Sequence, residues 1–329
     1  MCKRFIVGVL AVVCAGMTGC GGRVERSYTI GFMPKLVGIP YFNACRRGAE
    51  EAAQALNIQL VYNGPTKADS NQQIDLLNQW VASGNFDCMA VACNDPDLVA
   101  PALRAARSRG VRVVTYDADS QADAREYFVN MATYDAVAEA MVDAMAEELK
   151  PNVAGKVGIL TSSVQAPNQS EWAKRIKAYV KAKYPRIELL PEVEHGEDRD
   201  LGITKAKALI QATSDLRGII GLTSVAVPAA AEAVRQEGKQ GRIKVTGVST
   251  PRDMRDYLID GTVNAVILWN PVDLGYLAVH VADMVHKGNM PADGVVDIGR
   301  LKKIRIKDRE VLLGEPMRIT RENLKDFDF

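Results

Sequence analysis

Short apolar runs alternate with longer amphipathic stretches through most of this sequence, and this alternation limits the folds that the chain can adopt. The first apolar runs, between residues 28 and 117, are YTIGFM, IQLVYN, CMAVAC and VRVVTYD. The segments between them, 41–56, 70–83 and 97–109, carry apolar residues at helical spacing. Strands this uniformly apolar are buried on both faces, as in parallel sheets covered by helices. The pattern therefore predicts an α/β fold.

The same pattern is repeated in the second half of the chain. Its apolar runs are KVGILTS, IELLPEV, GIIGLTS, KVTGVS and VNAVILW, and helical stretches separate them at 171–183, 201–213, 227–237 and 251–259. A chain of 329 residues is long enough for two ordinary cores. We therefore expect two Rossmann-like lobes with parallel sheets.

The two lobes are expected to exchange segments of chain. We place the first crossover near 131–135, so that the N-terminal lobe takes residues 28–131. The apolar helix at 272–286 is expected to return to this lobe, within a segment of about 271–294. The C-terminal lobe then takes 132–270 and the tail from about 295 to 329. Several crossings predict a hinge, because a few loop residues can absorb a closing rotation.

The first residues have the composition of an export signal. A Lys-Arg pair precedes a mainly apolar run at 5–17, which is too short to cross a bilayer as a helix. The run ends in MTGC, which resembles a bacterial lipobox with methionine where leucine is usual. We expect residues 1–19 to be a removed signal peptide, Cys20 to be lipidated and 20–27 to be a tether. The alternative is a plain signal peptide with an incidental Cys20.

The charge balance argues against nucleic acid as a partner. Lys and Arg total 41 and Asp and Glu total 40, so the formal net charge is +1, and no long basic run occurs. A protein that holds a polyphosphate backbone needs clustered positive charge. We therefore expect no nucleic-acid partner.

Cysteine and histidine usage gives no sign of a disulfide framework or a metal site. Beyond the tether the cysteines are Cys45, Cys88 and Cys93. Cys88 and Cys93 belong to one strand-like run, where extended chain of about 3.3 Å per residue holds their Cα atoms too far apart for a disulfide. The sequence has neither CxxC nor the Cys/His spacing of a zinc site. We expect buried free thiols, no metal and no cofactor.

Polar residues directly follow several of the apolar runs. In open parallel α/β sheets, ligands bind beyond the carboxyl ends of the strands, where loops converge. The candidate ligand-binding residues at these ends are Lys35, Asn94, Asp117, Asp119, Thr223, Ser224, Ser249, Trp269 and Asn270. Hydroxyls, amides, carboxylates, one cation and one indole suit a neutral polyhydroxylated ligand.

Ordinary structural roles are alternatives for several of these residues. For Asp95, Ser249 and Thr250, the alternative to ligand contact is capping of the helices that follow them. Asp119 could be a turn residue and Trp269 could pack in the core. Lys35 could pair with a carboxylate in a structural role. Asp117 directly ends a buried strand, and for it we favour ligand contact.

No catalytic motif is present to support an enzyme. The sequence lacks GxSxG, a Walker loop, and GxGxxG after the first apolar run. A Schiff base on Lys35 would require desolvation or a cationic neighbour to lower the pKa of the amine. We expect a binding protein; recovery of chemically altered ligand would point to an enzyme instead.

Several longer stretches form a recognisable set: FMPKLVG, NGPT, ALRAARSRGVRVVTYDAD, NQSEW, GVSTPRDMRDYLIDGTV, ILWNP and LKDFDF. Together they resemble the sugar-binding proteins of bacterial ABC importers, in the ribose-, rhamnose- and autoinducer-2-binding group. The resemblance extends over residues 28–329. It implies the periplasmic binding protein type 1 fold, in which two lobes joined by three crossings close on the ligand.

Two subgroups of this family compete for the ligand. The first half resembles autoinducer-2-binding proteins, whose ligand-holding lysine, aspartate and glutamine fall on Lys35, Asp117 and Gln169. The chain departs from them at three positions, which are Asn168 for an aspartate, Leu222 for a proline and Ser224 for an alanine. The second half resembles rhamnose-binding proteins in Asn168-Gln169, the TSV at 223–225 and LWNP. We therefore favour a monosaccharide, with rhamnose first.

The resemblance implies a function and a set of partners. Phe42, Asn168 and Gln169 join the expected ligand-binding residues. The protein is expected to be a monomeric lipoprotein, in the periplasm or on the outer face of a bacterial membrane, that delivers its sugar to an ABC permease. An autoinducer-2-binding protein of the same fold, or a sugar sensor feeding a signalling receptor, is the alternative. A sugar-responsive repressor would carry a helix-turn-helix where the signal segment stands.

Overall fold

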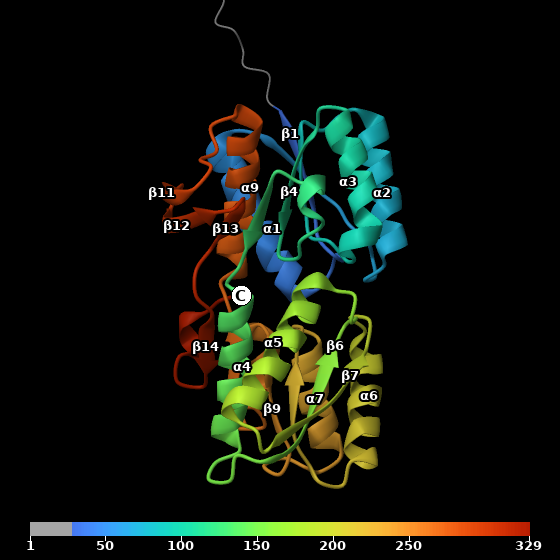
Figure 1. Cartoon of the computed structure of the whole chain (residues 1–329), viewed down its shortest axis with the longest axis vertical. Coiled ribbons are helices and arrows are strands. Elements are labelled where there is room, and N and C mark those ends of the chain that lie inside the picture. The colour runs from blue at the N-terminus through green and yellow to red at the C-terminus, as the bar shows by residue number, and fades with distance from the viewer. Residues whose placement is uncertain (1–27) are drawn as a thin grey trace, which may run out of the picture.

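Two α/β lobes lie end to end in the computed structural model, which describes residues 28–329 (Figure 1). Each lobe has its own sheet, with helices packed on it. The predicted fold class, two lobes with parallel sheets, is confirmed. The expected signal peptide, Cys20 and the tether lie outside the described residues.

The N-terminal lobe is built on an eight-stranded sheet with the order β11-β12-β13-β5-β4-β3-β1-β2. Its strands are β1 (Thr29–Met33), β2 (Gln59–Tyr62), β3 (Cys88–Val91), β4 (Arg112–Tyr116), β5 (Tyr127–Asn130), β11 (Gly294–Ile298), β12 (Leu301–Lys307) and β13 (Glu310–Leu312). β1 to β5 run parallel, and β13 continues the parallel set beside β5. All four residues of β3 are buried, as the uniformly apolar run predicts.

Helices cover both faces of this sheet (Figure 1). They are α1 (Pro40–Leu56), α2 (Ser70–Ser83), α3 (Pro96–Ser108) and α9 (Pro271–Lys287), and a short 3-10 helix, η1 (Ala122–Ala124), follows β4. α2 and α3 share one core with Met89 and Val113, whereas α1 and α9 pack against Ala90 and Val114. Alternate strand residues thus face opposite helical layers, which explains the lack of polar alternation in these strands.

The C-terminal lobe has a parallel four-stranded sheet with the order β7-β6-β8-β9. Its elements are α4 (Tyr134–Glu148), β6 (Gly155–Thr161), α5 (Pro167–Lys183), β7 (Ile187–Glu194), α6 (Arg199–Ala212), β8 (Leu216–Gly221), α7 (Ala226–Gln236), β9 (Lys244–Gly247), α8 (Pro251–Ile259), β10 (Ala265–Leu268), β14 (Met317–Thr320) and η2 (Leu324–Asp326). β10 and β14 form an antiparallel pair, which a bridge from Val248 to Ile267 links to the end of β9. α4 packs with α5, and α6 packs with α7.

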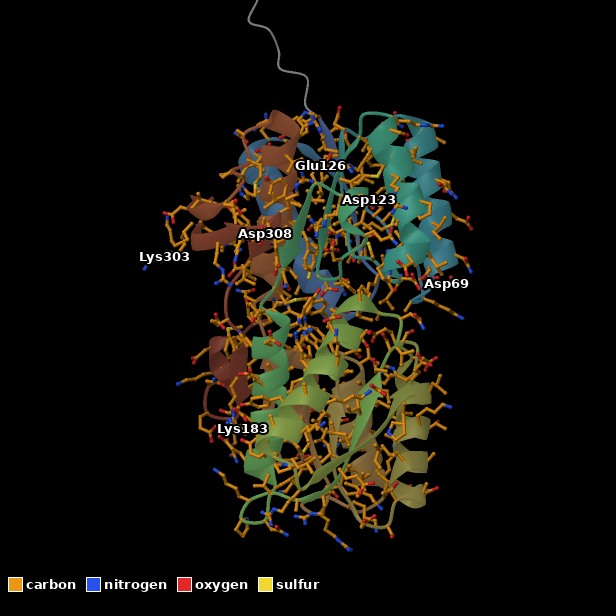
Figure 2. All side chains as sticks on the ribbon, viewed as in Figure 1. Asp69, Asp123, Glu126, Lys183, Lys303 and Asp308 are labelled. Atoms are coloured by element: carbon orange, nitrogen blue, oxygen red, sulfur yellow. The ribbon has the colours of Figure 1, made fainter. Side chains whose placement is uncertain are left out.

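The tail of the chain divides between the two lobes. β11 and β12 form an antiparallel hairpin, β12 pairs with β13, and β13 pairs with β5. β11 to β13, which we expected in the C-terminal lobe with the rest of the tail from 295, instead join the sheet of the N-terminal lobe, whereas β14 pairs with β10. β5 is an inner strand of the sheet, because it lies between β4 and β13. Lys303 of β12 projects from the outer side of the N-terminal lobe (Figure 2).

Helix α9 carries the chain from the C-terminal strand β10 back onto the N-terminal lobe. It packs along α1 and also contacts β3 and β4. The two helices approach so closely that a Cβ on Gly275 would lie 1.8 Å from the carbonyl oxygen of Cys45. A Cβ on Gly48 would lie 1.7 Å from the carbonyl oxygen of Val272. Only glycine permits this backbone approach.

Within the described residues, the chain passes between the lobes at three places. These are the segments between β5 and α4, between β10 and α9, and between β13 and β14. The first and third segments run side by side, since Leu313 N donates a hydrogen bond of 2.9 Å to Asn130 O. Three parallel connections of a few residues each are suited to a hinge rotation between rigid lobes.

Candidate functional site

A cavity lies between the lobes, at the carboxyl ends of strands from both parallel sheets. Ligand sites in proteins are typically concave, with apolar walls and a few convergent polar groups. The sequence-predicted residues that line this cavity are Lys35, Phe42, Asp117, Asn168, Gln169, Thr223, Ser224 and Trp269. The first three belong to the N-terminal lobe and the others to the C-terminal lobe.

Lys35 forms the polar link across the cavity. It follows β1 in the N-terminal lobe, and its Nζ donates a hydrogen bond of 2.8 Å to Oδ1 of Asn168, in the first turn of α5. The same Nζ lies 3.8 Å from Oδ2 of Asp117. The exposed fractions of Lys35 and Asp117 are 4% and 3%. A buried cation is thus held between a carboxylate of its own lobe and an amide of the facing lobe.

Asp117 directly follows β4 and directs its carboxylate into the cavity. Its φ of 61° lies in the left-handed region, which turns the chain sharply at the end of the strand. Burial raises the pKa of Asp117, and Lys35 and the Tyr41 hydroxyl partly offset that effect by favouring the charged form. These two neighbours therefore favour the charged carboxylate, which can accept hydrogen bonds.

Tyr41 connects Asp117 to the facing lobe. Its hydroxyl donates a hydrogen bond of 2.7 Å to Oδ1 of Asp117 and accepts one of 2.9 Å from Nε1 of Trp269. Burial and the Asp117 charge raise the pKa of Tyr41 far above its usual value, so the hydroxyl keeps its proton. The sequence analysis missed Tyr41; its signal was an aromatic pair, with Phe42, at the start of the helix after β1.

Aromatic rings form the apolar wall of the cavity. The ring centroid of Tyr41 lies 5.0 Å from that of Phe42 and 6.0 Å from that of Trp269. Trp172, which the sequence analysis also missed, lies 5.8 Å from Trp269. Trp269 was expected either to stack on a ligand or to pack in the core, and it lines the cavity as part of this cluster.

Gln169 is fixed by the residues that end β6. Its Oε1 accepts hydrogen bonds from the Thr161 hydroxyl at 2.5 Å and from the Ser162 backbone N–H at 2.8 Å. These bonds orient the side chain next to Asn168. The amide pair at the start of α5 is therefore positioned by the strand end as well as by its own helix.

Four of the predicted residues are not among those that line the cavity. Asn94 donates from Nδ2 to the Lys35 carbonyl at 2.8 Å and so supports the loop that carries the lysine. Ser249 is fully buried and donates to the Ser224 carbonyl at 3.2 Å. Asn270 caps α9, accepting from the backbone N–H of Val272 at 2.9 Å.

The fourth of these residues, Asp119, pairs with Arg125. Its Oδ2 lies 2.7 Å from Nη2 of Arg125, and its Oδ1 accepts a bond of 2.5 Å from the Thr115 hydroxyl. The carboxylate is thus directed away from the cavity, into the turn that joins β4 to β5. Asp95 and Thr250 are helix caps: their side chains accept hydrogen bonds from backbone N–H groups in the first turns of α3 and α8.

The remaining cavity residues were not predicted as ligand-binding. They are Ile39, Leu222, Val248 and Glu197. Leu222 and Val248 follow β8 and β9 and are apolar, so nothing in their type distinguished them from core residues. Glu197 belongs to the turn after β7, a strand end that the sequence analysis did not search.

Potential metal ligands and thiols can be located within residues 28–329. These residues hold no group of His, Cys, Asp and Glu that could bind a metal ion. Cys45, Cys88 and Cys93 are buried and free, as predicted. No helix in this part of the chain is both long and apolar enough to cross a membrane.

Comparison with known proteins gives a consistent result. Residues 30–290 match the model of the family described as "Periplasmic binding protein domain". A D-allose-binding periplasmic protein of Escherichia coli (strain K12) is 25% identical over 256 residues, which are 73% of this chain and 79% of that protein.

Two solved structures resemble the whole described fold. A sugar ABC transporter protein from Actinomyces odontolyticus is 32% identical, with a TM-score of 0.71 over 92% of this chain and 100% of that chain. A solute-binding protein from Clostridium phytofermentas, with bound L-rhamnose, is 26% identical, with a TM-score of 0.86 over 91% and 98%. The family match spans most of the chain, and the two lobes enclose a cavity lined by both. The chain therefore belongs to the periplasmic binding protein domain family, whose members are binding proteins of the extracytoplasmic space.

Proposed function

We propose that this protein is the substrate-binding component of an ABC importer and captures a neutral monosaccharide by closure of its two lobes. The observation that carries the proposal is the hydrogen bond from Lys35 to Asn168 beside Asp117, inside a cavity with aromatic walls. Polar groups of both lobes meet there, so a small ligand would contact both at once. The structurally similar Actinomyces protein is described as a sugar ABC transporter.

The polar and aromatic groups of the cavity fit a polyol. Carboxylate and amide oxygens accept hydroxyl hydrogens, the Lys35 ammonium donates to sugar oxygens, and the faces of Trp269 and Phe42 can pack on C–H surface. Trp172 has a buried Nε1 without a hydrogen-bond partner among the described residues, and Glu197 has such an Oε2. A sugar hydroxyl is both donor and acceptor and can satisfy either group.

We favour a rhamnose-like sugar over autoinducer-2. The Clostridium phytofermentas protein binds L-rhamnose, and the Escherichia coli relative is named for D-allose. The residues that depart from the autoinducer-2 pattern, Asn168, Leu222 and Ser224, all line the cavity. Lys35, Asp117 and Gln169 match that pattern, and for this reason autoinducer-2 remains the second candidate.

Isothermal titration calorimetry with L-rhamnose, D-allose, D-ribose and autoinducer-2 tests the ligand class. We expect binding of a monosaccharide, tightest for L-rhamnose, and recovery of the sugar unchanged. Selective binding of autoinducer-2 would reject the rhamnose preference. Failure of every neutral sugar to bind would reject the proposal itself.

Uptake measurements separate import from sensing. Deleting the gene in its native host should reduce uptake of the bound sugar if the protein delivers it to a permease. Unchanged uptake together with altered sugar-dependent transcription would identify a sensor that feeds a signalling receptor.

We further propose that a lipid on Cys20 anchors the protein to the outer face of a bacterial membrane. The proposal rests on the MTGC sequence alone. Cys20→Ala should release the protein from the membrane fraction and abolish incorporation of labelled fatty acid. Labelling that persists in the variant would contradict lipidation at this residue.

A further inference from the structure

Glu197 lines the cavity, but among the described residues its side chain neither caps a helix nor forms an ion pair. It lies in the turn between β7 and α6, directly after Gly196, and both residues have left-handed backbone, with φ of 60° and 61°. Glycine adopts this conformation freely, whereas glutamate is strained in it. Strained residues of this kind cluster at binding sites. The glutamate side chain therefore occupies a position where glycine would relieve the strain.

The carboxylate of Glu197 reaches into the cavity between the lobes. The residue as a whole is partly exposed, but its Oε2 is inaccessible to solvent and has no hydrogen-bond partner among residues 28–329. An unsatisfied buried acceptor is costly, and native structures contain few of them. Because Oε2 lies at a ligand cavity, a hydrogen-bond donor on the bound ligand can supply the missing bond.

The groups around Glu197 leave its charge unbalanced. Lys35 faces it from the loop after β1, and Asp117 faces it from the end of β4. The hydroxyls of Ser162, after β6, and Thr223, after β8, also interact with it. Lys35 is the one cation in this group, and it already contacts Asp117 and Asn168.

The histidine beside this turn does not supply a second cation. Burial lowers the pKa of His195 to about 4, so its imidazole is neutral at physiological pH. Burial raises the pKa of Glu197 to about 7, and Asp117 adds to this, while Lys35 and the two hydroxyls lower it. The carboxyl is therefore largely protonated below neutral pH in the unliganded protein.

We propose that Glu197 is a specificity-determining residue whose carboxylate Oε2 accepts a hydroxyl hydrogen of the bound sugar. The inference rests on the proposed function and adds one contact to it. Accepting a hydrogen bond favours the charged form of a carboxyl and lowers its pKa. Sugar binding should therefore release a proton from Glu197 near neutral pH, and a sugar lacking that hydroxyl should bind poorly.

Calorimetry at several pH values tests this contact. The sugar that binds the unmodified protein is titrated at about pH 5.5, 7 and 8.5, each in two buffers of different ionisation enthalpy, which gives the number of protons released. We expect proton release near pH 7 and affinity that falls by up to about tenfold per pH unit below it. Proton uptake, or affinity that does not change with pH, would overturn the inference.

Two variants assign the released proton to Glu197. Glu197→Gln keeps the shape and an accepting oxygen without the charge, so it should bind about tenfold more weakly at pH 8.5 and match the unmodified protein near pH 5.5. Its proton release should be absent. Asp200→Asn removes an exposed acid three residues away and should change neither quantity. If Glu197→Gln still released the proton, Asp117 would be its source and the inference would fail.

A third variant addresses the backbone. Glu197→Gly should raise the melting temperature of the unliganded protein, because glycine relieves the left-handed conformation, and should weaken sugar binding by more than tenfold at pH 8.5. Unchanged affinity in Glu197→Gly would contradict a ligand contact. If the unmodified protein binds no sugar at all, the proposed function fails; if it binds sugar but the Glu197 variants behave like it, only this inference fails.

Discussion

Two carboxylates of the cavity, Asp117 and Glu197, lie in left-handed backbone with φ of 61° and 60°. Such a conformation costs an L-residue about 1 to 2 kcal/mol, although aspartate tolerates it better than glutamate. Burial also raises the pKa of both groups, so each is unfavourable for the unliganded fold. Both residues therefore lower the stability of the unliganded fold at positions where a ligand would bind.

Asp117→Ala should abolish sugar-induced thermal stabilisation and leave the unliganded fold intact. The variant removes a charge-assisted acceptor, a loss of roughly 1.5 to 3 kcal/mol in binding. The measurement is a melting curve with and without saturating sugar, with circular dichroism as the check on folding. Asp119→Ala is the matched control: it breaks the ion pair with Arg125, so it should lower the melting temperature yet preserve the shift caused by sugar. Full stabilisation in Asp117→Ala would contradict its role.

Glu197→Gln should change how the stability of the unliganded protein depends on pH. Burial raises the pKa of Glu197 from its usual value of 4.5 to about 7, so ionisation of this carboxyl opposes folding. Below about pH 4.5 the carboxyl is protonated in both states and contributes nothing; the penalty grows as pH rises and is complete above about pH 7, at roughly 2 to 3 kcal/mol. Urea unfolding of both proteins at a series of pH values should show the variant gaining stability relative to the original over this range. A constant difference would contradict the buried, unbalanced carboxyl.

At the scale of elements, the crossing of α1 and α9 ties the end of the chain to its beginning. α9 follows β10 of the C-terminal lobe, yet it packs mainly on α1 and on strands of the N-terminal lobe. Glycines on both helices allow backbone contact, and α1 carries Tyr41 and Phe42 in its first turn. The packing that fixes α1 therefore also fixes part of the aromatic wall.

Gly275→Ala should destabilise the protein by several kcal/mol. The added Cβ would lie 1.8 Å from the carbonyl oxygen of Cys45, which is backbone and cannot move aside as a flexible side chain could. Overpacking in a core costs about 1 to 3 kcal/mol or more. Urea unfolding measures the effect, and Gly314→Ala, where nothing lies within 4 Å, is the control and should be nearly neutral. Similar losses in the two variants would contradict the close helix crossing.

At the scale of the whole molecule, the lobes are joined by three short crossings and by side chains that meet over the cavity. The bonds from Lys35 to Asn168 and from Trp269 to Tyr41 both connect one lobe to the other. The ring of Tyr41 also packs against that of Trp269 across the cavity, and buried apolar residues of both lobes belong to one cluster. Each lobe nevertheless has its own hydrogen-bonded sheet, so the lobes can separate at the interface while both sheets stay intact.

Asn168→Leu should favour an open arrangement of the lobes, because it removes the acceptor for the buried Lys35 ammonium. We expect a larger radius of gyration without sugar, measured by small-angle X-ray scattering, and a loss of sugar affinity of more than tenfold. Asp143→Asn is the control, since Asp143 pairs with Lys183 on the outer surface of the C-terminal lobe (Figure 2). A variant as compact as the original, with unchanged affinity, would contradict a closing role for this bond.

Some of the residues that line the cavity could be predicted from the sequence, because they stand at strand ends. Lys35 and Asp117 were identified because their polar type contrasts with the apolar run beside them, whereas Asn168 was predicted from the family resemblance. Asp119 and Asn270 have the same type and a similar position, but Asp119 pairs with Arg125 and Asn270 caps α9. The sequence does not show which neighbour a polar side chain will find. Glu197 and Trp172 were missed because neither directly follows a strand that was searched.

The sequence by itself determined the alternation of strands and helices, the two parallel sheets and the polar strand ends, because these follow from local hydrophobic periodicity and from how parallel sheets are covered. Tertiary structure alone decided that β13 pairs with β5, that α9 lies on α1, and that Lys35 meets Asn168 across 133 positions of sequence. Such contacts depend on which surfaces are left to be buried once the elements have formed. No short stretch of sequence contains that information.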